Sequence, residues 1–558
     1  MRDLTDRLPL PPPKPQHVSL SDRPDSLPRR LLQLTALFLL FLAVCEGRLA
    51  VLAMDTDAYR AVQQQSLWMQ QLTDGRGEIL DHDLAPLTGT DTVPVAAVLQ
   101  GRRDYTALFD AADEEARARL YAGMDGAAPF LIRLNETADG AFLCPQRYAN
   151  DPLAVHVIGY RSADGIGLTG AERAFNDYLD GGGDVLTVRC TTDALSQART
   201  EAELRRTQGS GNALQLTLST PIQRICEDVA RQQLPTGAIV VMECATGRVK
   251  ACVSTPVYDP NDVQKSIEAK DSALVNRAFS SFNVGSVYKP LLAALALEQP
   301  DFDPEAEYEC SGCIEVDGHV YHCAHTGGHG TVDLQTALEV SCNCYFIQLG
   351  LQLPVQDIVD LSAALGLGSA TPLGGGWMAG SGNLPDADVL AAAGELATLS
   401  FGQGQLTATP LQMAAAFNAV ANDGIYISPT LAEGLVNNNT KEITESLYRP
   451  IQLRAMREET AEALRGLLTG VVENGLGSGA AIPEAAVAGK TGTAQTGRIA
   501  KAADGSRHEL YDSWFVGFYP ADAPRYTIAV LQDSTTVTGE DVAPVFAAVC
   551  RQLYYLEH

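Results

Sequence analysis

Three short motifs hold the residues of this chain that could carry out nucleophilic chemistry: Ser286-Val287-Tyr288-Lys289, Ser341-Cys342-Asn343 and Lys490-Thr491-Gly492. A serine hydroxyl is a weak nucleophile until an adjacent base takes its proton. Ser286 and Lys289 are three positions apart, so on a helix their Cβ atoms would lie about 5–6 Å from each other. A lysine amine can be that base when burial and nearby positive charge lower its pKa. The first motif therefore predicts Ser286 as the nucleophile and Lys289 as its base.

The residues around the first motif predict a helix that begins close to Ser286. Gly285 permits a tight turn into this helix. Pro290 fits a helix only within the first turn, which again places the start near Ser286. The serine would then lie near the positive end of the helix dipole, which stabilises developing negative charge.

The second motif offers two polar groups that could act beside the nucleophile. The hydroxyl of Ser341 can both donate and accept a hydrogen bond, so it can relay a proton. The side-chain amide of Asn343 can bind the backbone of a peptide substrate. We therefore expect both residues to contact the reacting peptide.

The third motif predicts an edge strand that binds a carboxylate. Lys490-Thr491-Gly492-Thr493 follows the apolar stretch 485–488. Gly492 has no side chain, so a substrate backbone could approach the strand closely. The ammonium group of Lys490 and the hydroxyls of Thr491 and Thr493 can hold a terminal carboxylate.

Each motif is unspecific when taken alone, because a serine followed by a basic residue at this spacing recurs by chance, as in Ser196-Gln197-Ala198-Arg199. The ordered set of three is far more specific and is the combination found in penicillin-recognising enzymes. On this set the sequence resembles the class B, monofunctional penicillin-binding proteins. Further runs carry the resemblance over roughly residues 55–555, at 76–81, 170–172, 258–261, 276–278, 402–404 and 514–518.

The resemblance implies a D,D-transpeptidase that cross-links peptidoglycan stem peptides. Ser286 would attack the penultimate D-Ala carbonyl, Lys289 would accept its proton, and Ser341 would relay a proton to the leaving D-Ala. The backbone N–H groups of Ser286 and Thr493 would form the oxyanion hole, and Asn343 would orient the acyl chain. An amine of a neighbouring stem would then resolve the acyl-enzyme.

The resemblance also implies the ligands and partners. Lys490, Thr491, Gly492 and Thr493 would bind the carboxylate end of the stem peptide, and β-lactam antibiotics would acylate the same serine. Neither a metal nor an organic cofactor is required. A polytopic membrane glycosyltransferase is the expected partner. Cys342 stands where many members of the family have aspartate, and we expect it to be a packing residue.

Three other functions stay open: a D,D-carboxypeptidase, a β-lactamase-type acyl hydrolase, and a non-catalytic β-lactam-binding scaffold or sensor. A class A β-lactamase has a glutamate between the second and third motifs. Residues 361–385 contain no Asp or Glu, and Glu395 has no asparagine four positions later. The intact lysines of the first and third motifs argue against an idle scaffold. A bifunctional synthase is excluded, because the segment before the transpeptidase region is short and does not resemble a glycosyltransferase.

The N-terminal part contains a candidate membrane anchor. An uncharged apolar run covers 31–45, follows Arg29 and Arg30, and resumes at 49–53. The first run alone is short of the ~20 residues that span a bilayer, and Glu46 and Arg48 interrupt the apolar segment near its far edge, where long side chains can snorkel. The positive-inside rule puts the N-terminus in the cytoplasm and the rest of the chain outside. A cleaved signal peptide is the alternative, whereas a lipoprotein signal would need a small residue in place of Val44.

The composition excludes some partners and leaves the cysteines open. The net charge of −28 over 558 residues argues against nucleic acid, because phosphate binding needs a basic face. Twelve cysteines in a chain of this length do not indicate a disulfide framework. Cys310, Cys313 and Cys323 with His325 form only half of a zinc pattern. Free thiols or a local disulfide are the favoured interpretation of that cluster.

These observations predict an α+β (multi-domain) protein with four parts. We expect a cytoplasmic disordered tail at 1–30, a transmembrane helix at 31–53, a mixed α/β pedestal domain at 54–210, and a C-terminal penicillin-binding transpeptidase domain at 211–558 with a central antiparallel sheet flanked by helices. Apolar periodicity and turn residues predict helices at 54–72, 107–122, 171–179, 221–233, 385–399, 409–422 and 540–554, strands at 155–160, 214–218, 237–242, 249–253 and 525–532, and a polar linker at 197–212.

Overall fold

The protein is described here by a computed structural model that covers residues 26–54, 67–99, 105–124, 126, 128–193, 195–269, 271–501 and 505–558. Helix α1 (Ser26–Met54) contains the predicted anchor. Its segment Pro28–Val51 has a mean hydropathy of 2.0, and none of its most apolar window is buried. By length and composition α1 could therefore cross a membrane. Most of the predicted tail, and residues 55–66 of the predicted polar helix, lie outside the described residues.

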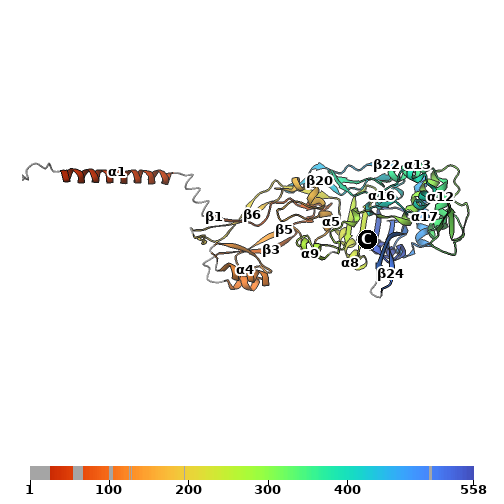
Figure 1. Ribbon diagram of the computed structural model, residues 1–558, viewed down its shortest axis with the longest axis horizontal. Coiled ribbons are helices and arrows are strands. Elements are labelled where there is room, and N and C mark those ends of the chain that lie inside the picture. The colour runs from red at the N-terminus through yellow and green to blue at the C-terminus, as the bar shows by residue number, and fades with distance from the viewer. Residues whose placement is uncertain are drawn as a thin grey trace, which may run out of the picture.

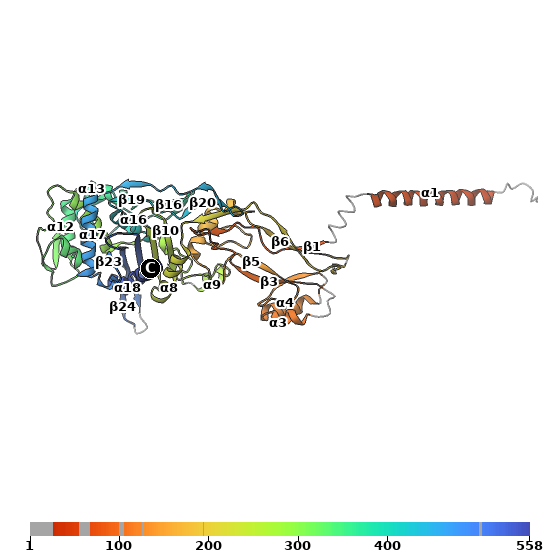
Figure 2. The same ribbon diagram turned by 180° about the vertical axis from the view of Figure 1, so that it is seen from behind.

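Two three-stranded antiparallel sheets build the N-terminal end of the folded part (Figures 1 and 2). One has the order β1-β6-β7 and the other β4-β3-β5. Helices α3 (Thr106–Ala111) and α4 (Glu114–Met124) cover the second sheet through a small core that includes Leu108, Leu120 and Ile132. The strands are β1 (Leu67–Gln71), β3 (Asp91–Val98), β4 (Phe130–Arg133), β5 (Ala141–Gln146), β6 (Val185–Thr191) and β7 (Glu203–Thr207).

Three sequence predictions in this region are wrong. The end of the predicted helix 54–72 is strand β1, because Trp68 packs with Val188 and Cys190 in a core between the strands. The predicted linker 197–212 contains β7, which pairs with β6. The β-rich run 155–160 forms one helical turn, α5 (Val155–Ile158), whose four residues are all buried. Tertiary packing overrides the β-propensity of that run.

A four-stranded sheet joins the two ends of the folded part. Its order is β2-β8-β20-β21. β2 (Ile79–Leu80) pairs in parallel with β8 (Asn212–Leu216), and β8 pairs antiparallel with β20 (Ala432–Asn437), which pairs with β21 (Glu442–Ser446). Backbone hydrogen bonds therefore connect the predicted pedestal directly to the C-terminal part.

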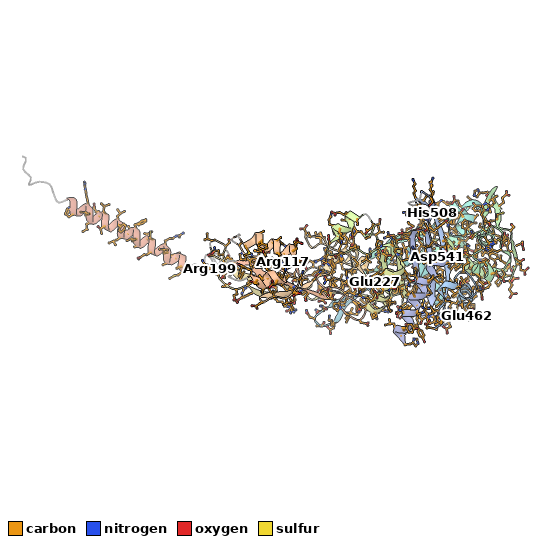
Figure 3. All side chains as sticks on the ribbon, turned by 90° about the horizontal axis from the view of Figure 1, so that it is seen from below. Arg117, Arg199, Glu227, Glu462, His508 and Asp541 are labelled. Carbon is orange, nitrogen blue, oxygen red and sulfur yellow. The ribbon has the colours of Figure 1, made fainter. Side chains whose placement is uncertain are left out.

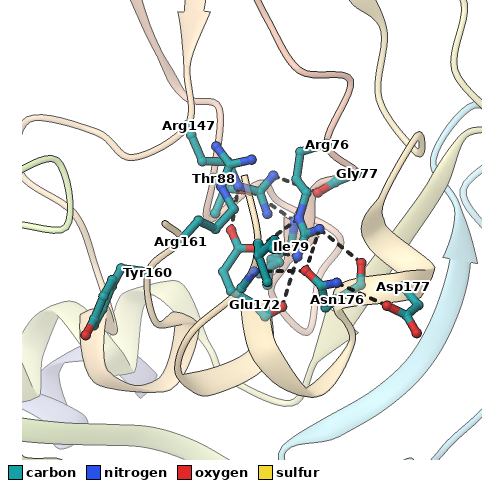
Figure 4. A network of polar contacts seen from close by, with 12 residues as sticks. Arg76, Gly77, Ile79, Thr88, Arg147, Tyr160, Arg161, Glu172, Asn176 and Asp177 are labelled. Atoms are coloured by element: carbon teal, nitrogen blue, oxygen red, sulfur yellow. Dashed lines mark hydrogen bonds and ion pairs between the residues drawn. The ribbon is translucent and has the colours of Figure 1, made fainter. Parts of the chain in front are cut away.

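Beside this sheet lies a buried polar network centred on Glu172 (Figure 4). Glu172 accepts from Nε of Arg76 at 2.9 Å and from Nε of Arg147 at 2.7 Å. Arg76 also donates to the backbone oxygen of Asn176 at 3.0 Å. The carboxylate lies on α6 (Gly170–Ala174), next to α7 (Asn176–Leu179). Buried charges are tolerated only when they are paired in this way, which explains why the runs 76–81 and 170–172 occur together.

The C-terminal part is built on a five-stranded antiparallel sheet with the order β10-β9-β25-β24-β23 (Figure 1). Alternate residues of β25 (Tyr526–Thr535) face opposite sides. Ile528 and Val530 pack with helices α8 (Thr220–Gln233) and α18 (Gly539–Glu557), whereas Ala529 and Leu531 pack with α16 (Pro410–Ala421). The other strands are β9 (Gly237–Glu243), β10 (Val249–Thr255), β23 (Ala488–Lys501) and β24 (Arg507–Tyr519). The predicted antiparallel sheet flanked by helices is confirmed.

Strands β23 and β24 extend past their neighbours as a hairpin that carries the exposed side chain of His508 (Figure 3). Helices and short hairpins surround the other end of β23. They are α10 (Lys289–Glu298), α11 (Leu334–Glu339), α12 (Asn343–Gln352), α13 (Val355–Ala364), α14 (Ala387–Leu390), α15 (Ala393–Ser400), α17 (Glu458–Glu473), β12 (Tyr308–Cys310), β13 (Cys313–Val316), β14 (His319–His322) and β15 (Gly330–Val332).

The remaining described elements are short. They are α9 (Val263–Ala269), η1 (Arg277–Phe279), β11 (Phe282–Asn283), η2 (Gly285–Tyr288), β16 (Thr371–Gly374), β17 (Trp377–Ala379), β18 (Thr407–Ala408), β19 (Ile425–Ile427), β22 (Gln452–Arg454) and η3 (Ser478–Ala480). The segment predicted as one helix at 385–399 is divided into α14 and α15.

Candidate active site

Ser286 lies at the start of a helix, as the sequence predicts. The 3-10 turn η2 runs directly into α10, which has Pro290 in its first turn. Gly285 has a φ of +62°, and its N–H donates to the carbonyl oxygen of Gly402 at 2.7 Å. Val287 is buried, whereas Ser286 stays partly accessible to solvent. The turn thus presents the hydroxyl while its neighbours fix it to the core.

Lys289 is completely buried, and its ammonium group is held by the second motif. Nζ donates to the carbonyl oxygen of Ser341 at 2.7 Å, to the hydroxyl of Ser341 at 3.2 Å and to Oδ1 of Asn343 at 2.7 Å. Burial lowers the pKa of Lys289 to about 8, against the opposing effect of the nearby Cys342. Within the described residues, no hydrogen bond joins Nζ to the hydroxyl of Ser286. The first two motifs are therefore assembled around the lysine.

The second motif forms the junction between α11 and α12. Ser341 adopts a φ of +56°, which is uncommon for a residue with a side chain. Cys342 caps α12 by accepting from the backbone N–H of Tyr345, and Asn343 is the first residue of that helix. The left-handed turn at Ser341 directs both its carbonyl and its hydroxyl oxygen to Lys289. Unfavourable backbone geometry of this kind is often retained where function needs it.

The third motif lies on β23, which is an edge strand as predicted. Lys490 is completely buried, and Nζ donates to the carbonyl oxygen and hydroxyl of Thr491 at 3.1 and 3.3 Å. Burial lowers the pKa of Lys490 well below its usual value, and the charge of Lys289 lowers it further. Thr493 accepts from the N–H of Gly539 at 2.9 Å. That contact leaves the proton of the Thr493 hydroxyl able to donate to a ligand.

Gly492 has a packing role that the sequence does not reveal. A Cβ atom at this position would lie 3.0 Å from Cγ1 of Val287 and 3.2 Å from the carbonyl oxygen of Val284. On the other side of the contact, a Cβ at Gly285 would lie 3.1 Å from Cβ of Ala494. The two glycines therefore allow the turn that carries Ser286 to lie directly against β23.

Other residues that fix this turn were missed by sequence reasoning. Trp514 of β24 donates its indole N–H to the carbonyl oxygen of Asn283 at 2.7 Å. Arg277 pairs with Asp533 at 2.5 Å and so ties the segment before the turn to the end of β25. The runs 276–278 and 514–518 contribute to the resemblance, but the sequence does not reveal these contacts, because the partners are more than 200 positions apart in the chain.

The cysteine cluster differs from the one considered in the sequence. Cys310, Cys323, His329 and Cys342 place their sulfur and nitrogen atoms within 4.8 Å of one another. Cys313 is exposed, and the exposed ring of His325 contacts the carbonyl oxygen of Gly328 instead, at 2.9 Å. A local disulfide is not formed, since all described cysteines are free thiols. The cluster thus includes the middle residue of the second motif and can hold a metal ion.

The comparison with protein families identifies the fold around these motifs. The model of the penicillin binding protein transpeptidase domain matches residues 237–551, which is more than half of the chain. The chain belongs to the class B penicillin-binding proteins. A relative in this family, stage V sporulation protein D of Bacillus subtilis, is 32% identical over 71% of the chain and 62% of its own length. The peptidoglycan D,D-transpeptidase PbpA of Mycobacterium tuberculosis is 30% identical over 78% of the chain and 89% of its own length.

Solved structures support the same membership. The D,D-transpeptidase domain of a peptidoglycan glycosyltransferase from Eggerthella lenta is 27% identical with a TM-score of 0.63, and covers 86% of this chain and 98% of its own. Penicillin-binding protein 3 of M. tuberculosis in complex with aztreonam is 25% identical with a TM-score of 0.64, and covers 88% and 97%. The chain spans less than two thirds of the length of several curated relatives, as with the B. subtilis protein.

Proposed function

We propose that this protein is a serine D,D-transpeptidase that cross-links peptidoglycan stem peptides and is acylated by β-lactams. The observation that carries the proposal is the position of Lys289. Lys289 lies three residues after Ser286, and its buried Nζ donates to Oδ1 of Asn343 in the second motif at 2.7 Å. The turn that carries Ser286 packs on β23, the strand that carries Lys490. A lysine whose pKa is lowered to about 8 can accept a proton near neutral pH. Membership of the transpeptidase family supports the same activity.

The proposed reaction follows from the groups around Ser286. The hydroxyl oxygen attacks the carbonyl carbon of the penultimate D-Ala while Lys289 takes the hydroxyl proton. The N–H groups of Ser286 and Thr493 stabilise the oxyanion. The proton then passes through the hydroxyl of Ser341, which contacts Nζ at 3.2 Å, to the nitrogen of the leaving D-Ala. An amine of a second stem attacks the acyl-enzyme and restores the free serine.

Substrate binding is proposed for the remaining motif residues. Asn343 lies at the N-terminal end of α12, partly accessible to solvent, and its amide can bind the acyl chain. Lys490, Thr491 and Thr493 bind the terminal carboxylate: the two threonine hydroxyls donate to it, and the buried Nζ of Lys490 donates to Thr491 and holds it in place. Gly492 keeps the strand close enough to the Ser286 turn for both to contact one peptide. None of these steps uses an organic cofactor.

Labelling with a fluorescent penicillin tests the nucleophile. We expect the full-length wild type in detergent to be labelled covalently and the Ser286→Ala variant to stay unlabelled. The Ser281→Ala variant is a matched control, because Ser281 is an exposed serine that lies just before the same turn. Equal labelling of the wild type and Ser286→Ala would disprove the assignment.

Product analysis separates the transpeptidase from its alternatives. With stem peptides and an acceptor amine, a transpeptidase forms dimers, whereas a D,D-carboxypeptidase or β-lactamase-type hydrolase transfers the acyl group to water. Accumulation of hydrolysed tetrapeptide alone would favour hydrolysis. A scaffold or sensor would be acylated by penicillin and form no product from stem peptides.

We propose that α1 anchors the protein in the cell membrane in a single pass, with the N-terminus cytoplasmic and residues from 54 onward outside. Arg29 and Arg30 at its N-terminal end support this orientation. The exposed thiol of Cys313 is a natural reporter. A membrane-impermeant maleimide added to intact cells should label it, and Cys313→Ser should lose the label. Labelling only after lysis would overturn the proposed topology.

We further propose that the segments 54–210 and 211–558 act as pedestal and transpeptidase domain, and that the pedestal contacts a polytopic membrane glycosyltransferase. One structure of similar fold is that of a peptidoglycan synthase complex that coordinates polymerization and crosslinking. A cleft of about 950 Å³ is lined mostly by the pedestal, with Pro260, Asn261, Asn438 and Asn439 contributed by the segment 211–558. Its charged lining is mostly basic, in a chain of net charge −28: Arg76, Arg119, Arg133, Arg147, Arg161 and Arg206 face Asp74, Glu78 and Asp184.

An acidic segment of the partner would complement this cleft. Arg119 and Arg133 are both exposed at its rim. We expect Arg119→Glu combined with Arg133→Glu to reduce co-purification with the glycosyltransferase. Arg117→Glu is the control, since Arg117 is exposed on the same helix, α4, and does not line the cleft (Figure 3). An equal reduction by the control would exclude the cleft as the contact.

A further inference from the structure

Four potential metal ligands meet behind the second catalytic motif. Nδ1 of His329 lies 3.7 Å from Sγ of Cys310 and 3.4 Å from Sγ of Cys323. Sγ of Cys323 lies 3.8 Å from Sγ of Cys342. All four donor atoms are within 4.8 Å of one another. They come from four separate places in the sequence, so their convergence is a property of the fold.

Three of these separations match the edges of a tetrahedral metal site. A zinc ion with Zn–S bonds of about 2.3 Å at tetrahedral angles holds two sulfur atoms about 3.8 Å apart. With a Zn–N bond of about 2.0–2.1 Å, the edge between sulfur and nitrogen is about 3.6 Å. The Cys323–Cys342 distance of 3.8 Å and the two Cys–His329 distances of 3.4 and 3.7 Å agree with both values.

The surroundings of the sulfur atoms also suit metal ligands. The backbone N–H of Asn343 points to Sγ of Cys323 at 3.3 Å, and that of Tyr345 points to Sγ of Cys342 at 3.5 Å. Amide groups that donate to sulfur stabilise thiolate ligands and fix their orientation. The three cysteines are buried and His329 is partly accessible, so an ion could enter from the histidine side.

The loops that carry the ligands are built for close approach. Gly328, with a φ of +78°, lies next to His329, and a Cβ atom there would lie 2.2 Å from the carbonyl oxygen of Cys310. A Cβ atom at Gly312 would lie 2.5 Å from the carbonyl oxygen of Thr326. Only glycine allows the two loops to touch in this way. The loops therefore bring Cys310 and His329 to one point before any ion binds.

We propose that Cys310, Cys323, His329 and Cys342 bind one zinc ion. Three thiolates and one imidazole form a ligand set for structural zinc, with no open position for a substrate. Binding displaces the protons of the three thiols, and the imidazole binds through Nδ1 in its neutral form. A Cys323–Cys342 disulfide is the competing state. It would leave Cys310 and His329 without a common partner.

The site has a consequence for catalysis that rests on the proposed function. Cys342 stands between Ser341 and Asn343, both of which contact Nζ of Lys289. A zinc ion on Cys342 would tie these two residues to the segment 310–329. Cys342 is thus a positioning residue rather than a packing residue. The metal content itself can be measured independently of acyl transfer.

Metal analysis of matched variants tests the site. We expect one equivalent of zinc in the full-length wild type purified in detergent, and the same amount in Cys313→Ser and His325→Ala. Those two controls remove a thiol and an imidazole from the same segment that are not among the four ligands; the ring centroid of His325 lies 5.6 Å from that of His329. Cys310→Ser and His329→Ala should lose more affinity than the roughly 10–100-fold that a change in the outer shell costs. Cobalt-loaded wild type should show thiolate-to-metal charge-transfer absorption that Cys310→Ser lacks.

A second measurement covers variants that fail to fold. Wild-type protein stripped with a chelator under native conditions should show a lower Tm, restored by zinc and not by magnesium. Penicillin labelling should slow in the stripped protein and recover with zinc. A folded wild type that takes up less than one equivalent of zinc would overturn the proposal, as would mass-spectrometric detection of a Cys323–Cys342 disulfide in protein purified under native conditions. Equal zinc loss in the two control variants would overturn it too.

Discussion

Nζ of Lys289 lies 2.7 Å from Oδ1 of Asn343, so the proposed base is bound by the second motif and not by the nucleophile three residues before it. A hydrogen bond from the ammonium group to an amide oxygen favours the charged form, whereas complete burial favours the neutral form. Burial is the larger effect, and the pKa falls to about 8. Near neutral pH a fraction of the molecules therefore holds a lysine that can accept a proton.

Removal of this amine should slow acylation. In Lys289→Ala we expect the second-order rate constant of penicillin acylation to fall about 10²–10⁴-fold, the usual contribution of a general base. Stopped-flow or gel-based labelling over time measures the rate. The exposed Lys265 provides the control Lys265→Ala, which should react at the wild-type rate. A Lys289→Ala variant that keeps that rate would exclude the lysine as the base.

The rate should also depend on pH in a defined direction. The reactive form of Lys289 is neutral, and its pKa is lowered to about 8. Below that pH the amine is protonated, so the rate constant should rise by nearly tenfold per pH unit and level off above about 8. Acylation measured between pH 6 and 10, with a separate check that the protein stays folded, gives the profile. A profile that falls with pH in this range would contradict a neutral lysine base.

Gly492 should tolerate a side chain poorly, because an added Cβ atom would lie 3.0 Å from Cγ1 of Val287 and 3.2 Å from the carbonyl oxygen of Val284. Overpacking of this kind costs about 1–3 kcal/mol. We expect Gly492→Ala to lower the Tm and to slow acylation, since the clash moves the turn that carries Ser286. Gly466→Ala is the control: that site in α17 has open space around it, and alanine is the better helix former. A Gly492→Ala variant with normal Tm and rate would show that the turn and β23 are free to separate.

Much of the site was predictable because each motif is local. The spacing of Ser286, Lys289 and Pro290 predicts a helix start, and the structure has one there. The run 490–493 predicts an edge strand, and β23 is one. The sequence could not predict which motif Lys289 contacts, because that contact depends on the left-handed backbone conformation of Ser341.

The metal ligands illustrate the same limit. Sequence spacing alone indicates Cys313 and His325 as the other candidate metal ligands, because they are close to Cys310 and Cys323 in the chain. The fold directs Cys313 outward on β13 and brings His329 and Cys342 inward instead. In the pedestal, β1 and β7 give no alternating burial pattern: three of the five residues of β1 are exposed, and all five residues of β7 are exposed. Pairing with β6 decides their structure, and no local pattern reports it.

Glu172 provides the sharpest test of the pedestal. Its buried carboxylate accepts from both Arg76 and Arg147, so Glu172→Gln keeps the shape and leaves two guanidinium groups without a counter-charge. Breaking a buried pair in this way costs about 3–5 kcal/mol. We expect faster hydrogen exchange and tryptic cleavage around positions 76 and 172, measured by mass spectrometry.

The matched control for this prediction is Glu203→Gln. It removes the partner of Arg189 from an ion pair whose glutamate is 68% exposed, where the loss should be small. Penicillin acylation should change little in either variant, because Ser286 is held by β23, β24 and α10 rather than by the Glu172 network. Unchanged exchange around positions 76 and 172 in Glu172→Gln would mean that the two arginines find other partners, and that the network is not what fixes the run 76–81 to α6.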